Sequence, residues 1–175
     1  ETGKAIRQFA VPDTKYSRIA YSKDRSRAAI SSSTAIRVYD LEKGIGLHTF
    51  QSQSQSFSRL NCLEISPDGK FAATAMERDG SPVQIWDMKS GQLLRDLKTP
   101  QGFTQSLAFL PDSYRLLTGG SDKILRIWNV KSGAEMRRFE GAAVGPGGIC
   151  LSPNGYLVVT MGGSKRGPFA LWGLP

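Results

Sequence analysis

A segment of seven residues occurs four times in this chain of 175 residues, and its four copies align without a gap. Each copy begins with glycine and ends with a large apolar residue, Phe or Leu. The copies are residues 3–9, 44–50, 91–97 and 133–139. A unit that recurs at a regular spacing predicts a repeat fold, because each unit buries its apolar face only against its neighbours. The first copy stands at the start of the sequence, so we expect its strand to pair elsewhere in the fold.

A strand-like element with one aromatic residue recurs at nearly the same spacing. It covers residues 36–40, 83–87, 125–129 and 169–173, with Tyr39, Trp86, Trp128 and Trp172 as the aromatic positions. Apolar residues alternate with polar ones, which predicts half-buried β-strands. A third element, Ser66-Pro67-Asp68-Gly69, has relatives at residues 110–113 and 152–155, and a copy without the Pro at residues 22–25. It indicates a turn, because Pro presets φ and Gly accepts a positive φ.

A short apolar segment lies on each side of every turn. The segments before the turn are residues 19–21, 63–65, 107–109 and 149–151, and those after it are residues 27–31, 71–75, 115–119 and 156–160. Each unit therefore contains four short strands, which we name a to d. Strand c carries the aromatic residue, and strand d is the repeated seven-residue segment. Four antiparallel strands in a unit of about 40–45 residues predict one blade of a β-propeller.

Together these motifs resemble the WD-repeat (WD40) family over nearly all of the chain. Trp86-Asp87 matches the family's signature dipeptide, and Tyr39-Asp40, Trp128-Asn129 and Trp172-Gly173 are relaxed versions of it. The resemblance implies an all-β fold, a β-propeller built of four-stranded antiparallel blades, with four divergent repeats in a single domain, residues 1–175. The approximate bounds of the repeats are 3–43, 44–90, 91–132 and 133–175.

One family feature is missing from the sequence. The Gly-His pair that the family carries between strands d and a is absent from every repeat, and the only histidine, His48, falls in a strand d. The buried His–Asp–Ser–Trp network of the family is therefore not expected in its usual form. Asp122 keeps the matching Asp in one blade, and we expect blade rigidity to come mainly from apolar packing.

The last blade, which ends at Trp172, has no later segment that could supply its outer strand. The one spare outer strand is Ala5 to Phe9. Pairing it with a last blade would cover an edge that otherwise exposes its backbone. Three arrangements remain open: a piece of a longer WD-repeat chain, two copies that form an eight-bladed ring, or one chain that closes with four blades.

Catalysis has little support in the sequence. The expected position of His48 is a solvated outer strand without a neighbouring nucleophile, and no cluster of His, Asp or Glu has metal-ligand spacing. The glycine-rich residues 162–167 are read as a b–c turn, because no helix follows them as a phosphate-binding loop requires. Cys62 and Cys150 lie in apolar strands and are expected to be buried thiols. We therefore predict no enzyme, no cofactor and no metal.

The net charge of +8 is carried by basic residues scattered singly or in pairs, which predicts a generally basic surface. Ligands of propellers bind at the face formed by the d–a and b–c loops. Glu64 stands where the sister repeats have Ala20, Ala108 and Cys150, close to the central axis. The candidate partner-binding residues are Lys15, Phe57, Arg59, Glu64, Arg78, Lys98, Phe103, Lys123, Lys165 and Arg166.

The predicted function is a scaffold that binds a protein or an acidic or phosphorylated peptide through this loop face. Arg and Lys suit anionic groups, and the family resemblance implies protein binding. The alternative is a basic surface for nucleic acid or an anionic membrane, and an ordinary solvated rim accounts for the same residues. The sequence contains neither an apolar run of about 18 residues nor a signal-peptide pattern. We therefore expect a cytoplasmic protein without a membrane span.

Overall fold

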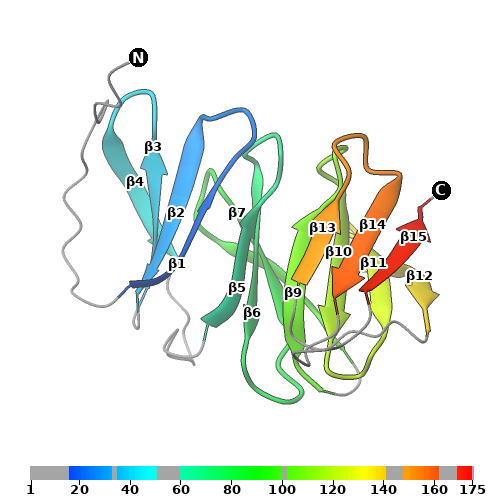
Figure 1. The fold of residues 1–175 in the computed structure, drawn as a ribbon. Coiled ribbons are helices and arrows are strands. Elements are labelled where there is room, and N and C mark those ends of the chain that lie inside the picture. The colour runs from blue at the N-terminus through cyan, green and yellow to red at the C-terminus, as the bar shows by residue number, and fades with distance from the viewer. Residues whose placement is uncertain are drawn as a thin grey trace.

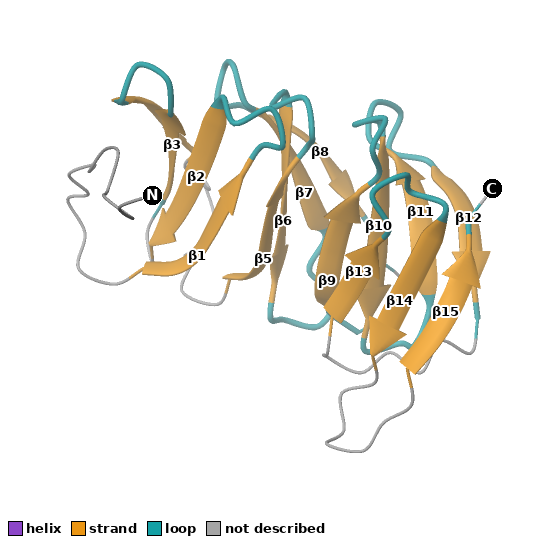
Figure 2. Cartoon of the chain, turned by 45° about the horizontal axis from the view of Figure 1, so that its top comes forward, coloured by secondary structure: helices purple, strands orange, loops and turns teal. Residues whose placement is uncertain are grey.

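The computed structural model describes residues 16–32, 35–50, 60–99, 102–140, 148–161 and 169–174. Within these residues the chain forms fifteen β-strands in four antiparallel sheets (Figures 1 and 2). This confirms the all-β fold and the division into four blades that the repeats predict. No helix in the described ranges is long and apolar enough to cross a membrane.

Three sheets, blades 1 to 3, have four strands each, and every strand pairs with the next one in the chain. Blade 1 contains β1 (Tyr16–Tyr21), β2 (Arg27–Ser32), β3 (Ile36–Asp40) and β4 (Ile45–Phe50). Blade 2 contains β5 (Leu60–Ile65), β6 (Phe71–Met76), β7 (Val83–Asp87) and β8 (Leu93–Leu97). Blade 3 contains β9 (Thr104–Phe109), β10 (Arg115–Gly120), β11 (Leu125–Asn129) and β12 (Glu135–Phe139).

The fourth sheet, blade 4, has three strands among the described residues. They are β13 (Gly148–Leu151), β14 (Leu157–Met161) and β15 (Phe169–Gly173). The predicted outer strand Ala5 to Phe9 lies outside the described residues, so its pairing stays a prediction. Outer strands β4, β8 and β12 supply the fourth strands of blades 1 to 3, as the repeat analysis predicts.

Strand a of each blade is its innermost strand. Figure 1 shows the blades side by side in chain order, from blade 1 in blue and cyan to blade 4 in orange and red. Strand β5 contacts both β1 and β9, and β13 contacts β9. The four inner strands therefore follow one another around a shared inner surface.

The glycine that begins each repeated seven-residue segment is required by the backbone. Gly44, Gly91 and Gly133 have φ values of 74°, 74° and 76°. Glycine adopts this left-handed conformation without the steric cost that a side chain would add. This glycine lies in the c–d turn, and the residue that follows the aromatic position stabilises the same turn. In blade 2 that residue is Asp87, whose Oδ1 accepts hydrogen bonds from the backbone N–H of Lys89 and Ser90. Asn129 Oδ1 makes the corresponding bonds in blade 3, so the relaxed dipeptide keeps the turn.

The apolar core consists of three clusters, and each lies between two neighbouring blades. The first joins Ile36, Val38 and Phe50 of blade 1 to Leu63, Ile65 and Trp86 of blade 2. The second joins Val83, Ile85 and Leu97 of blade 2 to Leu107, Phe109, Leu116 and Trp128 of blade 3. The third joins Leu117, Leu125 and Ile127 of blade 3 to Val158, Trp172 and Leu174 of blade 4. Each blade therefore buries one face of its sheet against the opposite face of the next blade.

Hydrogen bonds from tryptophan, two of them buried and one partly buried, add to this packing. The indole Nε1–H donates to a threonine Oγ1 on strand b in three blades, at 3.0 Å for Trp86 and Thr74, 2.9 Å for Trp128 and Thr118, and 3.1 Å for Trp172 and Thr160. In blade 1 the corresponding residues are Tyr39 and Ile30. The strand-to-strand bond of the family network therefore persists in blades 2 to 4 although the histidine is absent.

Candidate functional site

Backbone hydrogen bonds join three loops at one end of blades 2 and 3. The Gly80 N–H donates to the Gly102 carbonyl at 3.0 Å, and the Ser121 N–H donates to the Phe103 carbonyl at 3.1 Å. Phe103 N–H returns a bond to Ser121 Oγ at 3.1 Å. The d–a loop before β9 is thus fastened to the b–c loops of both blades. We call residues 77–82, 98–99, 102–103 and 121–124 the loop face.

The loop face carries four of the predicted partner-binding residues. Arg78, Lys98 and Lys123 are exposed, and Phe103 is half-buried beside them in the same set of loops. Glu77 and Asp79 are exposed as well, so this part of the face holds charges of both signs. Five predicted partner-binding residues lie outside the described ranges. Four of them carry the predicted excess of positive charge, and one is aromatic: Lys15, Arg59, Lys165 and Arg166, and Phe57.

Asp122 does not contribute its charge to the loop face. Its carboxylate forms an ion pair with Arg126 Nη1 at 2.6 Å, and the Arg126 side chain is only 4% exposed. Arg126 Nε lies 3.3 Å from Glu135 Oε2 without the alignment of a hydrogen bond, and Glu135 also pairs with Arg138 at 2.6 Å. The Asp that the family resemblance assigned to the tryptophan network therefore belongs to a buried ion chain. Blade 3 thus contains ion pairs in addition to its apolar packing.

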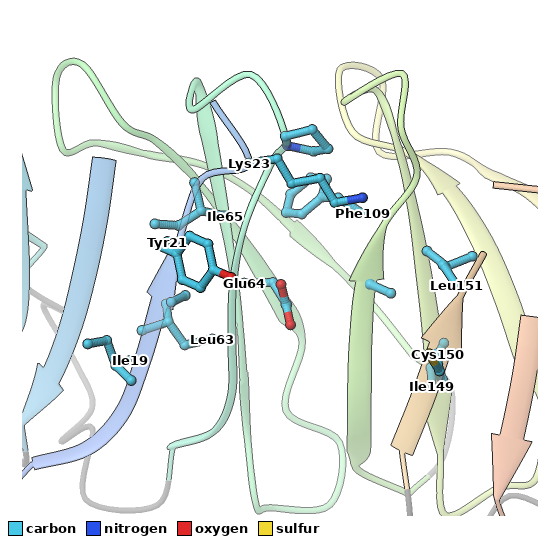
Figure 3. Close-up of a pocket in the computed structure, with 13 residues that line it drawn as sticks. Ile19, Tyr21, Lys23, Leu63, Glu64, Ile65, Phe109, Ile149, Cys150 and Leu151 are labelled. Carbon is cyan, nitrogen blue, oxygen red and sulfur yellow. The ribbon is translucent and has the colours of Figure 1, made fainter. Parts of the chain in front are cut away.

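A cavity of about 370 Å³ lies among the four inner strands (Figure 3). Glu64 points into it from β5 and is the one carboxylate among its lining residues. Ala20, Ala108 and Cys150, the sister positions of Glu64, also line it. The structure thus places Glu64 on the inner strands and not on the loop face with Arg78 and Lys123. Lys23 and Pro67 of the a–b turns line the end of the cavity that is remote from the loop face.

Burial raises the pKa of Glu64 from 4.5 to about 7, and the positive charge of Lys23 offsets part of this rise. The cause is the loss of water around the carboxylate, which disfavours its charged form. At neutral pH the cavity therefore contains a carboxyl group that is only partly ionised.

This shift predicts a pH-dependent stability. Below pH 4.5 the carboxyl is protonated in both the folded and the unfolded chain. Between pH 4.5 and 7 the unfolded chain ionises first, so the free energy of unfolding falls as the pH rises, and above pH 7 the loss is complete. We expect Glu64→Gln to exceed the wild-type protein by about 2 kcal/mol at pH 8, after allowance for partial solvation, and to match it at pH 4.5.

Urea titrations of both proteins from pH 4.5 to 8 measure this difference. Glu77→Gln, which removes an exposed carboxylate from the loop face, is the control for the loss of one carboxylate. A difference between Glu64→Gln and wild type that does not change with pH would contradict the shifted ionisation.

The two thiols differ in their surroundings. Burial raises the pKa of Cys62 to about 12, and its Sγ donates to the Gln105 carbonyl at 3.1 Å. Cys150, in contrast, is exposed, which corrects the expectation that both thiols are buried. The reason is its place on β13, the last inner strand, where it faces the cavity. No group of three His, Cys, Asp or Glu residues in the described ranges could hold a metal ion.

His48 is half-buried and not fully solvated as its strand position suggested. Its ring stacks on Phe50 with centroids 6.0 Å apart, and a side chain at Gly91 would lie 3.0 Å from the imidazole. His48 therefore packs beneath the c–d turn of blade 2. Its Nε2 is buried without a hydrogen-bond partner.

Sequence reasoning did not identify the threonines that bond the tryptophans or the buried Arg126. The threonines had a visible signal, because Thr74, Thr118 and Thr160 occupy the same position of strand b in three repeats. Arg126 had no such signal, because the residue type is not kept at the equivalent positions of the other repeats, which are Arg37, Gln84 and Ala170.

Comparisons with known proteins agree with this architecture. Residues 91–129 match the WD40 family, described as "WD domain, G-beta repeat". Actin-interacting protein 1 of Drosophila melanogaster is 40% identical over 86 residues, which is 47% of this chain and 14% of that protein. Periodic tryptophan protein 2 homolog of Neurospora crassa is 36% identical over 70 residues, 40% of this chain and 8% of that protein. Apoptotic protease-activating factor 1 of Homo sapiens is 33% identical over 113 residues, 59% of this chain and 9% of that protein.

The chain thus spans about a tenth of the length of these curated relatives. The match over residues 91–129 covers strands β8 to β11, so it runs from the outer strand of blade 2 to the Trp128 strand of blade 3. Four sheets with the same strand order and the same tryptophan-to-threonine bond in three of them extend this repeat along the chain. Residues 91–129 thus match a WD40 repeat, and the all-β architecture of four blades in the described residues is consistent with a WD-repeat β-propeller.

Proposed function

We propose that this chain is a non-catalytic scaffold that holds a protein or peptide partner on the loop face. The observation that carries the proposal is the bonding of three loops from blades 2 and 3 into one surface. Loops that vary in sequence over a rigid scaffold are typical binding sites, and here the scaffold is formed by the buried blade clusters.

The side chains of the loop face favour an acidic or phosphorylated segment. Lys98 and Lys123 are exposed cations on two of the bonded loops. Phe103, which lies between them in the amino-acid sequence, offers an apolar contact. Charge-assisted hydrogen bonds from Lys to a carboxylate or phosphate are stronger than neutral ones. The name of one relative, Actin-interacting protein 1, describes binding to another protein, which supports a protein partner.

The alternative partner is a polyanion such as nucleic acid or an anionic membrane, drawn by the net charge of +8. Exposed lysines are present at both ends of the blades, since Lys43 and Lys89 lie in c–d turns remote from the loop face. The loop face itself carries Glu77 and Asp79. This mixture of signs favours recognition of a defined segment over attraction of any polyanion.

A pair of charge-matched variants tests the proposal. Lys98→Glu with Lys123→Glu changes the loop face, and Lys43→Glu with Lys89→Glu makes the same change of charge at the opposite end. The probe is an array of acidic peptides with and without phosphoserine, at 150 mM salt. For the peptides that bind wild-type protein, we expect the loop-face variant to lose at least about tenfold in affinity and the control to stay within about twofold.

A 20-nucleotide single-stranded DNA serves as the polyanion probe. If the alternative is correct, both variants weaken its binding to a similar degree, and the affinity falls steeply with salt as several phosphate contacts are lost. That result, together with the absence of any bound peptide, would overturn the proposal.

A further inference from the structure

A second cavity lies between blades 1 and 2, at the end of the blades that is remote from the loop face. Its volume is about 420 Å³, within the range of pockets that hold small ligands. Blade 1 contributes Ser26 and Arg27 of its a–b turn, and blade 2 contributes Lys70, Met88 and Lys89 of its two turns. We call this cavity the turn pocket. All of its lining residues belong to two consecutive blades, so its walls do not involve either outer face of the row of blades.

One backbone hydrogen bond recurs at this corner in all four blades. In each blade an N–H of the segment after strand c donates to a carbonyl of the a–b turn. The pairs are Leu41 with Ser26 at 3.0 Å, Met88 with Lys70 at 2.9 Å, Val130 with Tyr114 at 2.8 Å, and Leu174 with Tyr156 at 2.6 Å. Lys70 of blade 2 is therefore the structural equivalent of Tyr114 in blade 3. Lys89 and Lys131, each one residue further along the c–d turn, are equivalent as well.

In blade 3 an aromatic ring occupies this corner. Lys131 Nζ lies 4.1 Å from the centroid of the Tyr114 ring, which is a cation–π contact. The phenol also lies within electrostatic reach of Lys70 on the preceding blade, since Asp68 chiefly and Tyr114 in addition raise the pKa of Lys70. The Tyr114 ring is thus placed between the lysine of its own c–d turn and the a–b turn of the blade before it.

The corresponding ring is missing from blade 2. Lys70 stands in its place, and the Lys70 ammonium turns back to Asp68 Oδ2 at 3.1 Å. The residue of blade 1 at this point is Ser26, whose side chain is short. Phe71 also lines the pocket, but it packs against the apolar cluster shared with blade 3. The turn pocket therefore corresponds to the space that a tyrosine ring fills in blade 3, with the exposed Lys89 at its edge.

We propose that the turn pocket binds a tyrosine side chain of a partner polypeptide, with the ring between Ser26 and Lys89. Lys89 lies over the bound ring as Lys131 lies over Tyr114, and the buried Met88 gives the ring an apolar contact. The partner is a polypeptide because the ring that fills the equivalent corner is itself a side chain carried by a turn. The bound ring is uncharged, so this site does not compete for the acidic peptides that test the loop face.

A nuclear magnetic resonance titration of the whole 175-residue chain tests the site. The probe is acetyl-Gly-Gly-Tyr-Gly-Gly-amide, and the matched probe has Leu in place of Tyr. We expect the Tyr peptide alone to give saturable shifts of the Gly69, Lys70 and Met88 amides, with a dissociation constant on the order of 1 mM. Lys89→Ala should weaken binding about two- to fivefold, the size of an exposed cation–π contact. Lys43→Ala, in the c–d turn of blade 1 and outside the pocket, should leave it unchanged.

Exchanging the equivalent residues tests the correspondence between the two corners. Lys70→Tyr supplies a ring from within the chain and should abolish binding of the Tyr peptide. Tyr114→Lys empties the corner of blade 3 and should add a second set of shifts, at Ser113 and Val130. Both substituted residues are exposed, so we expect both variants to keep the circular dichroism spectrum of the wild type.

Four results would overturn the proposal. The first is the absence of saturable shifts, and the second is equal shifts with the Tyr and Leu peptides. The third is undiminished binding of the Tyr peptide to Lys70→Tyr or to Lys89→Ala. The fourth comes from p-cresol, which carries the same ring without a peptide: if p-cresol binds and the Tyr peptide does not, the pocket accepts a free small molecule and not a polypeptide.

Discussion

Replacing Phe50 by Ala is expected to lower the free energy of unfolding by about 3–5 kcal/mol, the usual cost of removing a buried Phe side chain. Phe50 is 0% exposed and is the last residue of outer strand β4. Its ring stacks on Trp86 of blade 2 with centroids 5.1 Å apart and an angle of 3° between the planes. The substitution leaves a cavity and also removes the stacking contact of Phe50 with Trp86 of blade 2. Urea titration followed by tryptophan fluorescence measures the loss.

Two further substitutions calibrate this result. Leu47→Ala on the same strand alters a residue that is 36% exposed, and should cost less than about 1 kcal/mol. Phe139→Ala alters the matching position of blade 3, where the ring is half-buried and lies 6.0 Å from that of Trp172. Its expected cost is about 1–2 kcal/mol because less contact is lost. A cost for Phe50→Ala that equals the cost for Leu47→Ala would contradict the role assigned to the stack.

The Phe50 stack explains why each repeated segment ends in a large apolar residue. Phe50 packs on Trp86, Leu97 shares a buried cluster with Trp128, and Phe139 packs on Trp172. In each case the last residue of the outer strand of one blade lies in the same apolar cluster as, or in ring contact with, the aromatic residue of the next blade. The repeat analysis assigned these residues correctly to outer strands. The repeat analysis did not show that these terminal residues join neighbouring blades. Periodicity identifies which face of a strand is apolar, but it does not identify the element that covers that face.

Other parts of the structure were predictable to different degrees. Alternation and turn residues were sufficient for the strands, since both are local properties of the sequence. Repeat alignment placed Glu64 near the axis with its sister positions, and the structure has all four lining one cavity. The hydrogen bonds that join the loops of the loop face were not predictable from the sequence. The bonds from Gly80 N–H and to the Phe103 carbonyl involve backbone atoms, which carry no sequence signal. Exposure of Cys150 was missed because it depends on the end position of β13.

The buried ion chain of blade 3 gives the second large effect. Arg126→Leu should destabilise the protein by about 3–5 kcal/mol, because removing one partner leaves a buried charge without compensation. Asp122 is 11% exposed and would lose the 2.6 Å ion pair to Arg126. Glu135 would keep its pair with Arg138. The loss should therefore arise mainly at Asp122, and the free energy of unfolding measured in urea at pH 7 should report it.

A graded set of variants locates this cost. Arg138→Leu removes the same side-chain type from the same ion chain, but at a position that is 52% exposed, and should cost less than about 1 kcal/mol. Adding Asp122→Leu to Arg126→Leu replaces the innermost pair by apolar groups and should recover most of the stability, since a buried pair contributes little beyond an apolar substitute. If the double variant is no more stable than Arg126→Leu, then the uncompensated carboxylate is not the source of the loss. The cost would then come from the packing of the long, buried Arg126 side chain.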